Sequence, residues 1–313
     1  MSASSAEALE VLKGPSRMFQ GFDEFEVEVE RGVKIFGRRG GNGPPLLLLH
    51  GFPQNHLIWH RVAEQLAKTF TVVAIDLRGY GLSTKLELQK QSNASYSKRA
   101  LAQDSVGVMK HHGFDDFYLC AHDRGARVAH RICVDYPARV RKVIMLDTAP
   151  TLAMYEKTDF TFAKAYYHWF FLIQPHPYPE TLISSNPEAF MEYNMGGRHH
   201  GGKSVFDEDA YKAYVQMMKD PAGVNAMCEE YRASANIDLD HHRQDKEDER
   251  EIRCPLMVLW GKHGIIEKCY DAKKEWQDVS SSTVVGQSLD CGHYIPEEQP
   301  EILLEKIHSF FKE

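Results

Sequence analysis

Long apolar runs are absent from this sequence. No stretch approaches the roughly 18 apolar residues needed to cross a membrane. The N-terminal segment also lacks a basic stretch followed by a long apolar one. We therefore expect no membrane span, no secretory signal and a cytoplasmic protein. The six cysteines show no CxxC spacing, which in that compartment favours reduced, mostly buried thiols over disulfides.

Basic charge is also scarce. The 37 Lys and Arg residues against 44 Asp and Glu residues give a net charge of −7, which excludes the basic surface typical of a general nucleic-acid-binding protein. Metal and dinucleotide motifs are missing too, because there is no HExxH and the glycines of Gly37–Gly43 do not spell GxGxxG. We expect no metal, no cofactor and no nucleic-acid partner.

Apolar runs alternate with helical patterns along most of the chain. Helices are predicted at about 59–68, 97–112, 126–134, 270–277 and 301–311. The predicted strands are Phe25–Glu30 and its hairpin partner Val33–Gly37, then Leu46–Leu49, Thr71–Ile75, Phe117–Cys120, Val140–Leu146, Pro255–Trp260 and Thr283–Gln287. Such alternation predicts an α/β fold whose sheet is mostly parallel, with right-handed crossovers.

This rhythm breaks after Pro150. Residues 151–250 contain no convincing buried strand, and their aromatic and polar pattern, interrupted by prolines, predicts a helical insertion. We place a core domain at residues 1–149 and 252–313 and a helical cap domain at residues 150–251. The charged stretch Asp238–Glu251, which closes the insertion, is predicted to be a solvated helix face or linker away from any site.

Asp123 stands at the apex of the motif Ala121-His122-Asp123-Arg124-Gly125, between a predicted strand and a predicted helix. Small residues two before and two after the apex allow the sharp, strained turn that presents a nucleophile. A carboxylate there can displace a leaving group from a saturated carbon and form an ester. The alternative is that Asp123 only caps the helix.

His50-Gly51-Phe52-Pro53 follows the strand Leu46–Leu49, where this architecture places an oxyanion-hole loop. The backbone N–H groups of Phe52 and Arg124 are the predicted donors to an ester oxyanion. Such a hole is useful only if an ester carbonyl is later attacked.

His293 lies near the C-terminus, after a predicted strand and before a predicted helix. This position makes it a candidate general base that activates water. A base of this kind needs a carboxylate to orient it. We assign that role to Asp147, which follows the strand Val140–Leu146, with Glu267 as the runner-up.

These motifs resemble the haloalkane dehalogenase and epoxide hydrolase branch of the α/β-hydrolases, and within it the fluoroacetate (haloacetate) dehalogenases. The resemblance extends from about Phe25 to Phe311 and implies the eight-stranded sheet and cap of that fold. His122–Arg127 matches the nucleophile segment, which implies that Arg124 and Arg127 bind the substrate carboxylate. Asp147 and His293 match the acid and base. Ala121, where Gly is commoner, and Cys291 depart from the pattern without removing a functional group.

The same resemblance assigns halide-binding donors to the insertion. Tyr167-His168-Trp169 and Cys228–Ala233 match the segments that supply them, which implies that His168, Trp169 and Tyr231 bind the halide. Their side chains offer an imidazole N–H, an indole N–H and a phenol O–H. The adjacent aromatic residues leave open that this segment is only the core of the cap. The resemblance also implies a homodimer.

The expected reaction is the hydrolysis of a 2-haloacetate to glycolate and halide through an ester on Asp123. One alternative is an epoxide hydrolase that uses Tyr231 with Tyr166 or Tyr167 to protonate the epoxide oxygen. The charged pair Arg124 and Arg127 is costly beside a neutral substrate, which disfavours that reading. An alternative of another class is a non-hydrolytic protein that binds small acids on the same fold.

Overall fold

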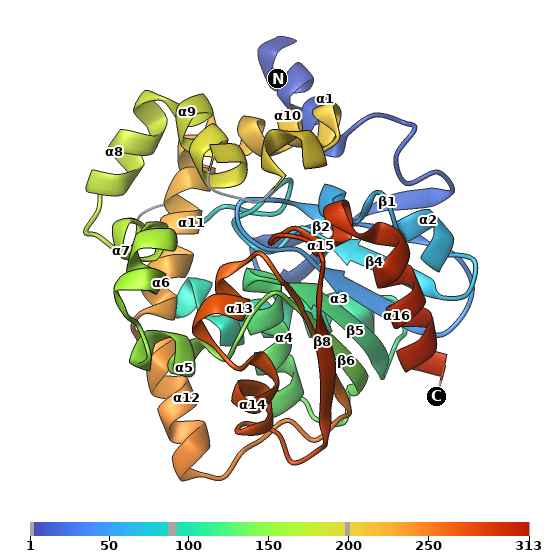
Figure 1. The fold of residues 1–313 in the computed structure, drawn as a ribbon. Helices are drawn as coiled ribbons and strands as arrows, with labels where there is room; N and C mark the ends of the chain where they lie inside the picture. The colour runs from blue at the N-terminus through green and yellow to red at the C-terminus, as the bar shows by residue number, and fades with distance from the viewer. Residues whose placement is uncertain (1–2, 87–92, 198–200, 313) are drawn as a thin grey trace.

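An eight-stranded sheet forms the centre of the computed structural model, which describes residues 3–86, 93–197 and 201–312 (Figure 1). The strand order is β1-β2-β4-β3-β5-β6-β7-β8. Only β2 runs antiparallel to its neighbours, and the other pairs are parallel. This confirms the predicted α/β class with a mostly parallel sheet.

All eight predicted strands are present, with ends shifted by one to three residues or not at all. Every residue of β3 and of β4 is buried, which explains why both read as continuous apolar runs. The bounds are β1 Phe22–Glu30, β2 Val33–Gly40, β3 Pro45–Leu49, β4 Thr71–Ile75, β5 Phe117–His122, β6 Val140–Leu146, β7 Leu256–Gly261 and β8 Val284–Leu289.

The helices of the core flank this sheet. One predicted helix, at 59–68, is wrong in form, because Asn55 caps a 3₁₀ turn and the α-helix that follows covers only Ala63–Leu66. The helix predicted at 270–277 is present as α14, which Asp271 caps separately from α13. The bounds are η1 His56–Trp59, α2 Ala63–Leu66, η3 Asn93–Tyr96, α3 Lys98–His111, α4 Arg124–Asp135, α13 Ile265–Cys269, α14 Ala272–Gln277, α15 Ile295–Glu298 and α16 Pro300–Lys312.

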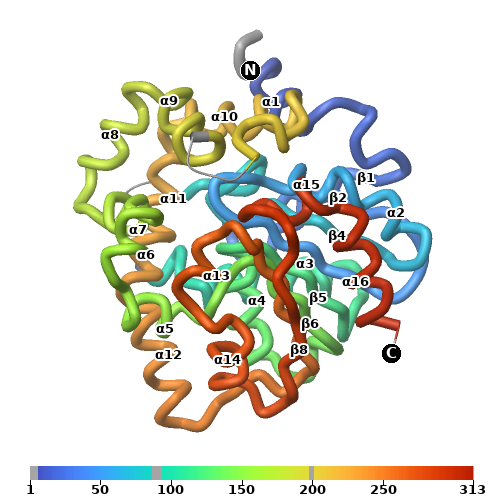
Figure 2. Tube along the Cα trace, viewed as in Figure 1, coloured from blue at the N-terminus to red at the C-terminus, as the bar shows by residue number. Residues whose placement is uncertain are grey.

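A helical insertion follows β6, as predicted, while the residue bounds of the two domains stay a prediction. The chain leaves the core as the green trace and returns as the orange trace before β7 (Figure 2). Its elements are α5 Thr151–Glu156, α6 Phe160–Ala165, α7 His168–Leu172, α8 Tyr178–Ser185, α9 Pro187–Met191, η4 Glu192–Gly197, η5 Gly202–Val205, α10 Glu208–Met218, α11 Pro221–Ser234 and α12 Ile237–Glu247. A further helix, α1 (Ala3–Lys13), packs on α10.

The charged stretch Asp238–Glu251 is mostly exposed and mostly helical, as predicted, but two of its carboxylates are not solvated. Most of it forms α12, in which Asp238 and Asp245 are buried. Asp238 accepts a hydrogen bond from the Lys98 backbone N–H (2.9 Å), and Asp245 lies 2.6 Å from Arg131 Nη1. Cationic partners on other helices compensate these carboxylates, which sequence patterning cannot reveal.

All six cysteines are unpaired, and five of them are buried, as predicted. Among the described helices, none is long and apolar enough to cross a membrane.

Gly125 offers a direct test of the turn between β5 and α4. A Cβ atom there would lie 2.3 Å from the His50 carbonyl oxygen and 2.7 Å from that of Leu49. We expect Gly125→Val to lower the free energy of unfolding by about 3 kcal/mol or more, because backbone would have to move. Urea unfolding measures this. Gly107→Ala on α3 is the control, since its Cβ would meet only Val29 at 3.3 Å, and an equal loss there would contradict the argument.

Candidate active site

Asp123 occupies the strained turn that the sequence predicted. Its backbone has φ 45° and ψ −111°, a conformation that non-glycine residues rarely adopt. Its side chain makes no capping hydrogen bond to α4. Asp123 Oδ2 instead accepts a hydrogen bond from the Phe52 backbone N–H at 3.1 Å. The alternative of a mere helix cap therefore has no support in the geometry.

The loop that carries Phe52 lies directly against the turn. A Cβ atom on Gly51 would lie 2.9 Å from both the Arg124 backbone nitrogen and Asp123 Oδ2, so only glycine allows this approach. His50 fixes the base of the loop, because its Nε2 accepts a hydrogen bond from the Leu77 N–H at 3.0 Å. Two backbone N–H groups thus lie beside the Asp123 carboxylate.

His293 and Asp147 form the second part of the site. His293 Nδ1 lies 2.5 Å from Asp147 Oδ2, and Asp147 Oδ1 accepts a hydrogen bond from the Gly261 N–H at 2.8 Å. A carboxylate at Nδ1 favours the tautomer whose Nε2 lone pair can take a proton. The runner-up acid Glu267 is exposed and bonds to the Trp260 indole instead.

The charge state of Asp123 suits a nucleophile. Burial alone would raise the pKa of this carboxyl, but electrostatic interaction with its neighbours, first His293 and then His122, Arg127 and Arg124, brings the pKa below its ordinary value. Burial lowers the pKa of the adjacent His122 to about 3, so that imidazole is neutral. Asp123 is therefore ionised at neutral pH.

Four buried donor atoms of the two arginines and of the predicted halide-binding residues have no hydrogen-bond partner within the part of the chain that is described. They are Arg124 Nη1, Arg127 Nε, Trp169 Nε1 and Tyr231 Oη. The Arg124 guanidinium lies 4.0 Å from the centroid of the Tyr231 ring, and that of Arg127 lies 4.6 Å from the centroid of the Trp169 ring. Unpaired buried donors are costly unless a ligand satisfies them. Donors gathered in this way are suited to an anion.

The two arginines differ in their partners, which the sequence did not predict. Arg124 donates from Nε at 2.8 Å and from Nη2 at 2.8 Å to the carboxylate of Glu230. Arg127 donates from Nη1 to the Ala149 carbonyl and to Thr151 Oγ1, and it forms no ion pair with any described residue. Arg127 is therefore the arginine whose charge has no carboxylate partner of its own.

The ring of His168 stacks on the ring of the loop residue Phe52 with 5.6 Å between centroids, and its centroid lies 5.8 Å from that of the Tyr231 ring. The rings of Trp169 and Tyr231 meet edge to face, with 6.4 Å between their centroids. The structure thus brings all three predicted halide-binding side chains, from α7 and α11, into one aromatic cluster beside Phe52.

The cavity at Asp123 is small. It has a volume of about 10 Å³, which is room for about one water molecule. It is lined by Phe52, Pro53, Asp123, Tyr166, His168, His293 and Tyr294. A wider cavity of about 500 Å³ shares Tyr166 and His293 with it and opens outward. Side chains must therefore shift to admit any organic substrate, and a small one requires the least movement.

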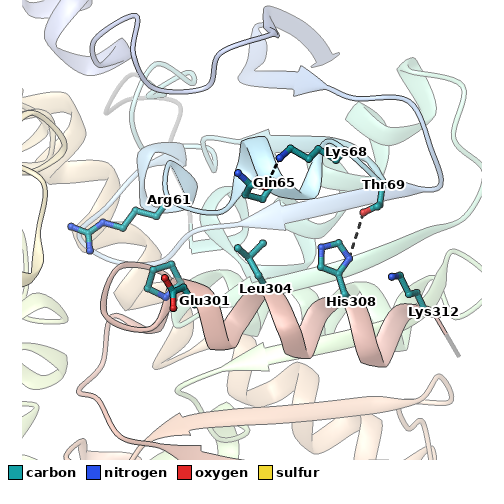
Figure 3. Close-up of a pocket in the computed structure, with 9 residues that line it drawn as sticks. Arg61, Gln65, Lys68, Thr69, Glu301, Leu304, His308 and Lys312 are labelled. Atoms are coloured by element: carbon teal, nitrogen blue, oxygen red, sulfur yellow. Dashed lines mark hydrogen bonds between the residues drawn. The ribbon is translucent and has the colours of Figure 1, made fainter.

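Volume alone does not locate this site. A groove of about 700 Å³ between α2 and α16, shown in Figure 3, is lined by residues such as Gln65, Leu304 and His308. It contains none of the candidate catalytic side chains. Within the described ranges, no group of three His, Cys, Asp or Glu side chains could hold a metal ion.

Comparison with known proteins decides the family. A family model for the alpha/beta hydrolase fold matches residues 44–300. The chain belongs to this family. This hydrolase is 38% identical to a fluoroacetate dehalogenase from Burkholderia sp over 95% of the chain and 96% of that protein. It is 28% identical to a soluble epoxide hydrolase from Corynebacterium sp. (strain C12), over 90% of the chain and 94% of that protein.

Solved structures agree with the hydrolase fold. A crystal structure from Nostoc sp PCC 7120, of a protein assigned to the alpha/beta hydrolases, superposes with a TM-score of 0.89 at 47% identity. The match covers 94% of this hydrolase and 99% of that chain.

Glu297 joins three parts of this hydrolase behind the site. The carboxyl group is fully buried on α15 and accepts hydrogen bonds from Gln54 Nε2 at 2.5 Å and Tyr214 Oη at 3.1 Å. Gln54 belongs to the Phe52 loop, and Tyr214 belongs to α10 of the insertion. Burial raises the pKa of Glu297 to about 8, although both hydrogen bonds oppose the shift.

Glu297→Gln should therefore change how stability depends on pH. The unfolded chain loses this proton near pH 4.5 but the folded chain keeps it to about pH 8, so this group makes the free energy of unfolding fall as pH rises between those values. We expect the variant to flatten that decline, and urea unfolding at several pH values across the window measures it. A difference between variant and wild type that is constant with pH would contradict the assignment.

Proposed function

We propose that this hydrolase dehalogenates 2-haloacetates to glycolate, with Asp123 as the nucleophile, His293 as the general base and Asp147 as the residue that orients His293. The observation that carries the proposal is the set of four buried, unpartnered donors near an ionised carboxylate. A haloacetate has a carboxylate for the arginines and a leaving halide for Trp169 and Tyr231. The resemblance to a fluoroacetate dehalogenase supports the same substrate class.

In the first step, an oxygen of Asp123 attacks the substrate Cα from the side opposite the halogen. A carbon–oxygen bond forms, the carbon–halogen bond breaks, and the halide leaves with the electron pair. Fluoride is a poor leaving group unless its developing charge is stabilised, and hydrogen bonds from His168, Trp169 and Tyr231 would supply that stabilisation. The product is a glycolyl ester of Asp123.

In the second step, His293 takes a proton from water, and the hydroxide attacks the ester carbonyl carbon of Asp123. The backbone N–H groups of Phe52 and Arg124 stabilise the oxyanion. The ester bond breaks, the departing glycolate oxygen takes the proton from His293, and the Asp123 carboxylate is restored. The net reaction consumes one water and releases glycolate, halide and a proton.

Epoxide hydrolysis is the second candidate, favoured by the unpartnered hydroxyl of Tyr231 and by the epoxide hydrolase relative. The buried guanidinium of Arg127, which forms no ion pair with any described residue, would stay uncompensated beside a neutral epoxide. The cavity of about 10 Å³ at Asp123 also favours a smaller substrate. A non-hydrolytic acid-binding protein would not need the pairing of His293 with Asp147.

Turnover and trapping together test the proposed function. We expect halide release from fluoroacetate, chloroacetate or bromoacetate and no hydrolysis of a neutral epoxide. Asp123→Asn should abolish release, and His293→Asn should accumulate the Asp123 ester, which mass spectrometry of peptides detects. In a single turnover in ¹⁸O water, the wild type should gain label on Asp123, because water attacks the enzyme's carbonyl. Label found only in glycolate would refute this mechanism, and acid binding without turnover would support the binding protein.

Tyr231→Phe tests the halide role, since it removes only the hydroxyl group. We expect kcat to fall roughly 100-fold for fluoroacetate, as for loss of one transition-state donor, and less than about tenfold for bromoacetate, whose leaving group needs less stabilisation. Tyr214→Phe is the matched control, because that buried hydroxyl bonds to Glu297 and should leave the ratio between the two substrates unchanged. Equal losses for both halides in Tyr231→Phe would contradict the assignment.

A further inference from the structure

Glu230 meets the guanidinium of Arg124 edge to edge. Nε of Arg124 lies 2.8 Å from Oε2 and 3.0 Å from Oε1, Nη2 lies 2.8 Å from Oε1, and Nη2 also donates to the Glu230 carbonyl at 3.3 Å. Both side chains are fully buried. This forked geometry is the most directional ion pair that an arginine can make. Among the described residues, nothing pairs with Nη1, the one remaining nitrogen of the guanidinium group.

Lys98 extends this pair into a buried network. Its ammonium group contacts Glu230 Oε1 and lies 3.6 Å from Asp238 Oδ2. The network therefore holds two cations and two anions, all of them buried, and their charges cancel. Lys98 is on α3, Arg124 on α4, Glu230 on α11 and Asp238 on α12, so two core helices and two helices of the insertion meet here.

Arg124 has a second carboxylate within electrostatic reach. It follows Asp123 directly in the chain, and its charge contributes to the lowered pKa of Asp123. Without Glu230, the buried guanidinium would be free to turn toward Asp123, and such a pair would block the nucleophile. Tyr231, the residue after Glu230, stacks on the same guanidinium with its ring centroid 4.0 Å from Cζ.

We propose that Glu230 and Lys98 are positioning residues that hold Arg124 away from Asp123 and present its Nη1 to the carboxylate of the ligand. Because Glu230 and Tyr231 are neighbours on α11, one turn of that helix fixes the carboxylate contact and a halide contact relative to each other. Glu230 also balances the charge of Arg124, so that Arg127 supplies the uncompensated positive charge. The inference rests on the proposed function only in taking the ligand to be a small carboxylate.

Acetate binding to the full-length protein tests this role without requiring turnover. Calorimetry should show that Glu230→Gln binds acetate at least tenfold more weakly than wild type. Lys98→Met should also bind acetate more weakly, whereas the affinity of Lys98→Arg should stay within about threefold of wild type. Bromide binding, followed by quenching of tryptophan fluorescence, should stay within about threefold in each variant. Unchanged or tighter acetate binding in Glu230→Gln would overturn the proposal, because a purely charge-balancing Glu230 would strengthen anion binding when removed.

Two further comparisons separate positioning from structural support. Asp245→Asn breaks another buried ion pair between α4 and α12, that of Arg131 with Asp245, and should leave acetate binding unchanged even where the melting temperature falls. In an Arg124→Gln background, Glu230→Gln should weaken acetate binding less than about threefold, because the two residues act as a unit. Additive losses would refute action through Arg124.

Turnover distinguishes this inference from the proposed function. With chloroacetate, Glu230→Gln should raise KM at least tenfold. Wild-type acetate binding without halide release would refute the proposed function alone. Halide release with equal KM in wild type and Glu230→Gln would refute the positioning role alone, and a wild type that neither binds acetate nor releases halide would refute both.

Discussion

The compensation of buried charge decides which groups of this site remain available to a ligand. A charged side chain out of water is costly unless it is paired or hydrogen-bonded. Arg124 meets this requirement through Glu230, whereas Arg127 meets it only with neutral oxygen and sulfur acceptors. The guanidinium of Arg127 and the unpartnered donors around it therefore form a site suited to an anion. Binding there would stabilise both the anion and the protein.

The net charge of −7 is compatible with an anionic substrate for the same reason. Surface carboxylates act through water, where a unit charge at about 10 Å contributes a few tenths of a kcal/mol before screening by salt. The guanidinium groups of Arg124 and Arg127 are buried and act through a much lower effective dielectric constant. Local arrangement, rather than overall composition, sets the potential that a ligand meets.

Local patterns predicted most of the strands well, and they also predicted which carboxylate lies beside His293. Strands β4 and β6 have the predicted bounds, and Asp147 rather than Glu267 meets His293, because strand order fixes where loops converge. Partners distant in sequence were beyond such reasoning. Glu230 lies 106 residues from Arg124 in the sequence. Asp238 belongs to a charged stretch of sequence, and only the packing of α12 against Lys98 shows that it is buried. A buried ion pair has no signature in one segment alone.

The insertion contributes more than a cover over the sheet. Trp169, Tyr231 and Glu230 all come from its helices, while Asp123, His293 and both arginines come from the core. For the proposed haloacetate, neither part by itself would align the carboxylate, the carbon and the leaving halide, because the contacts proposed for the two ends of this ligand arise from different parts. The Glu230 contact to Arg124 joins these parts through rigid, forked hydrogen bonds. Small ligands leave little tolerance for misalignment, since displacement at carbon requires the nucleophile and leaving group in line, and a buried ion pair is well suited to fix that geometry.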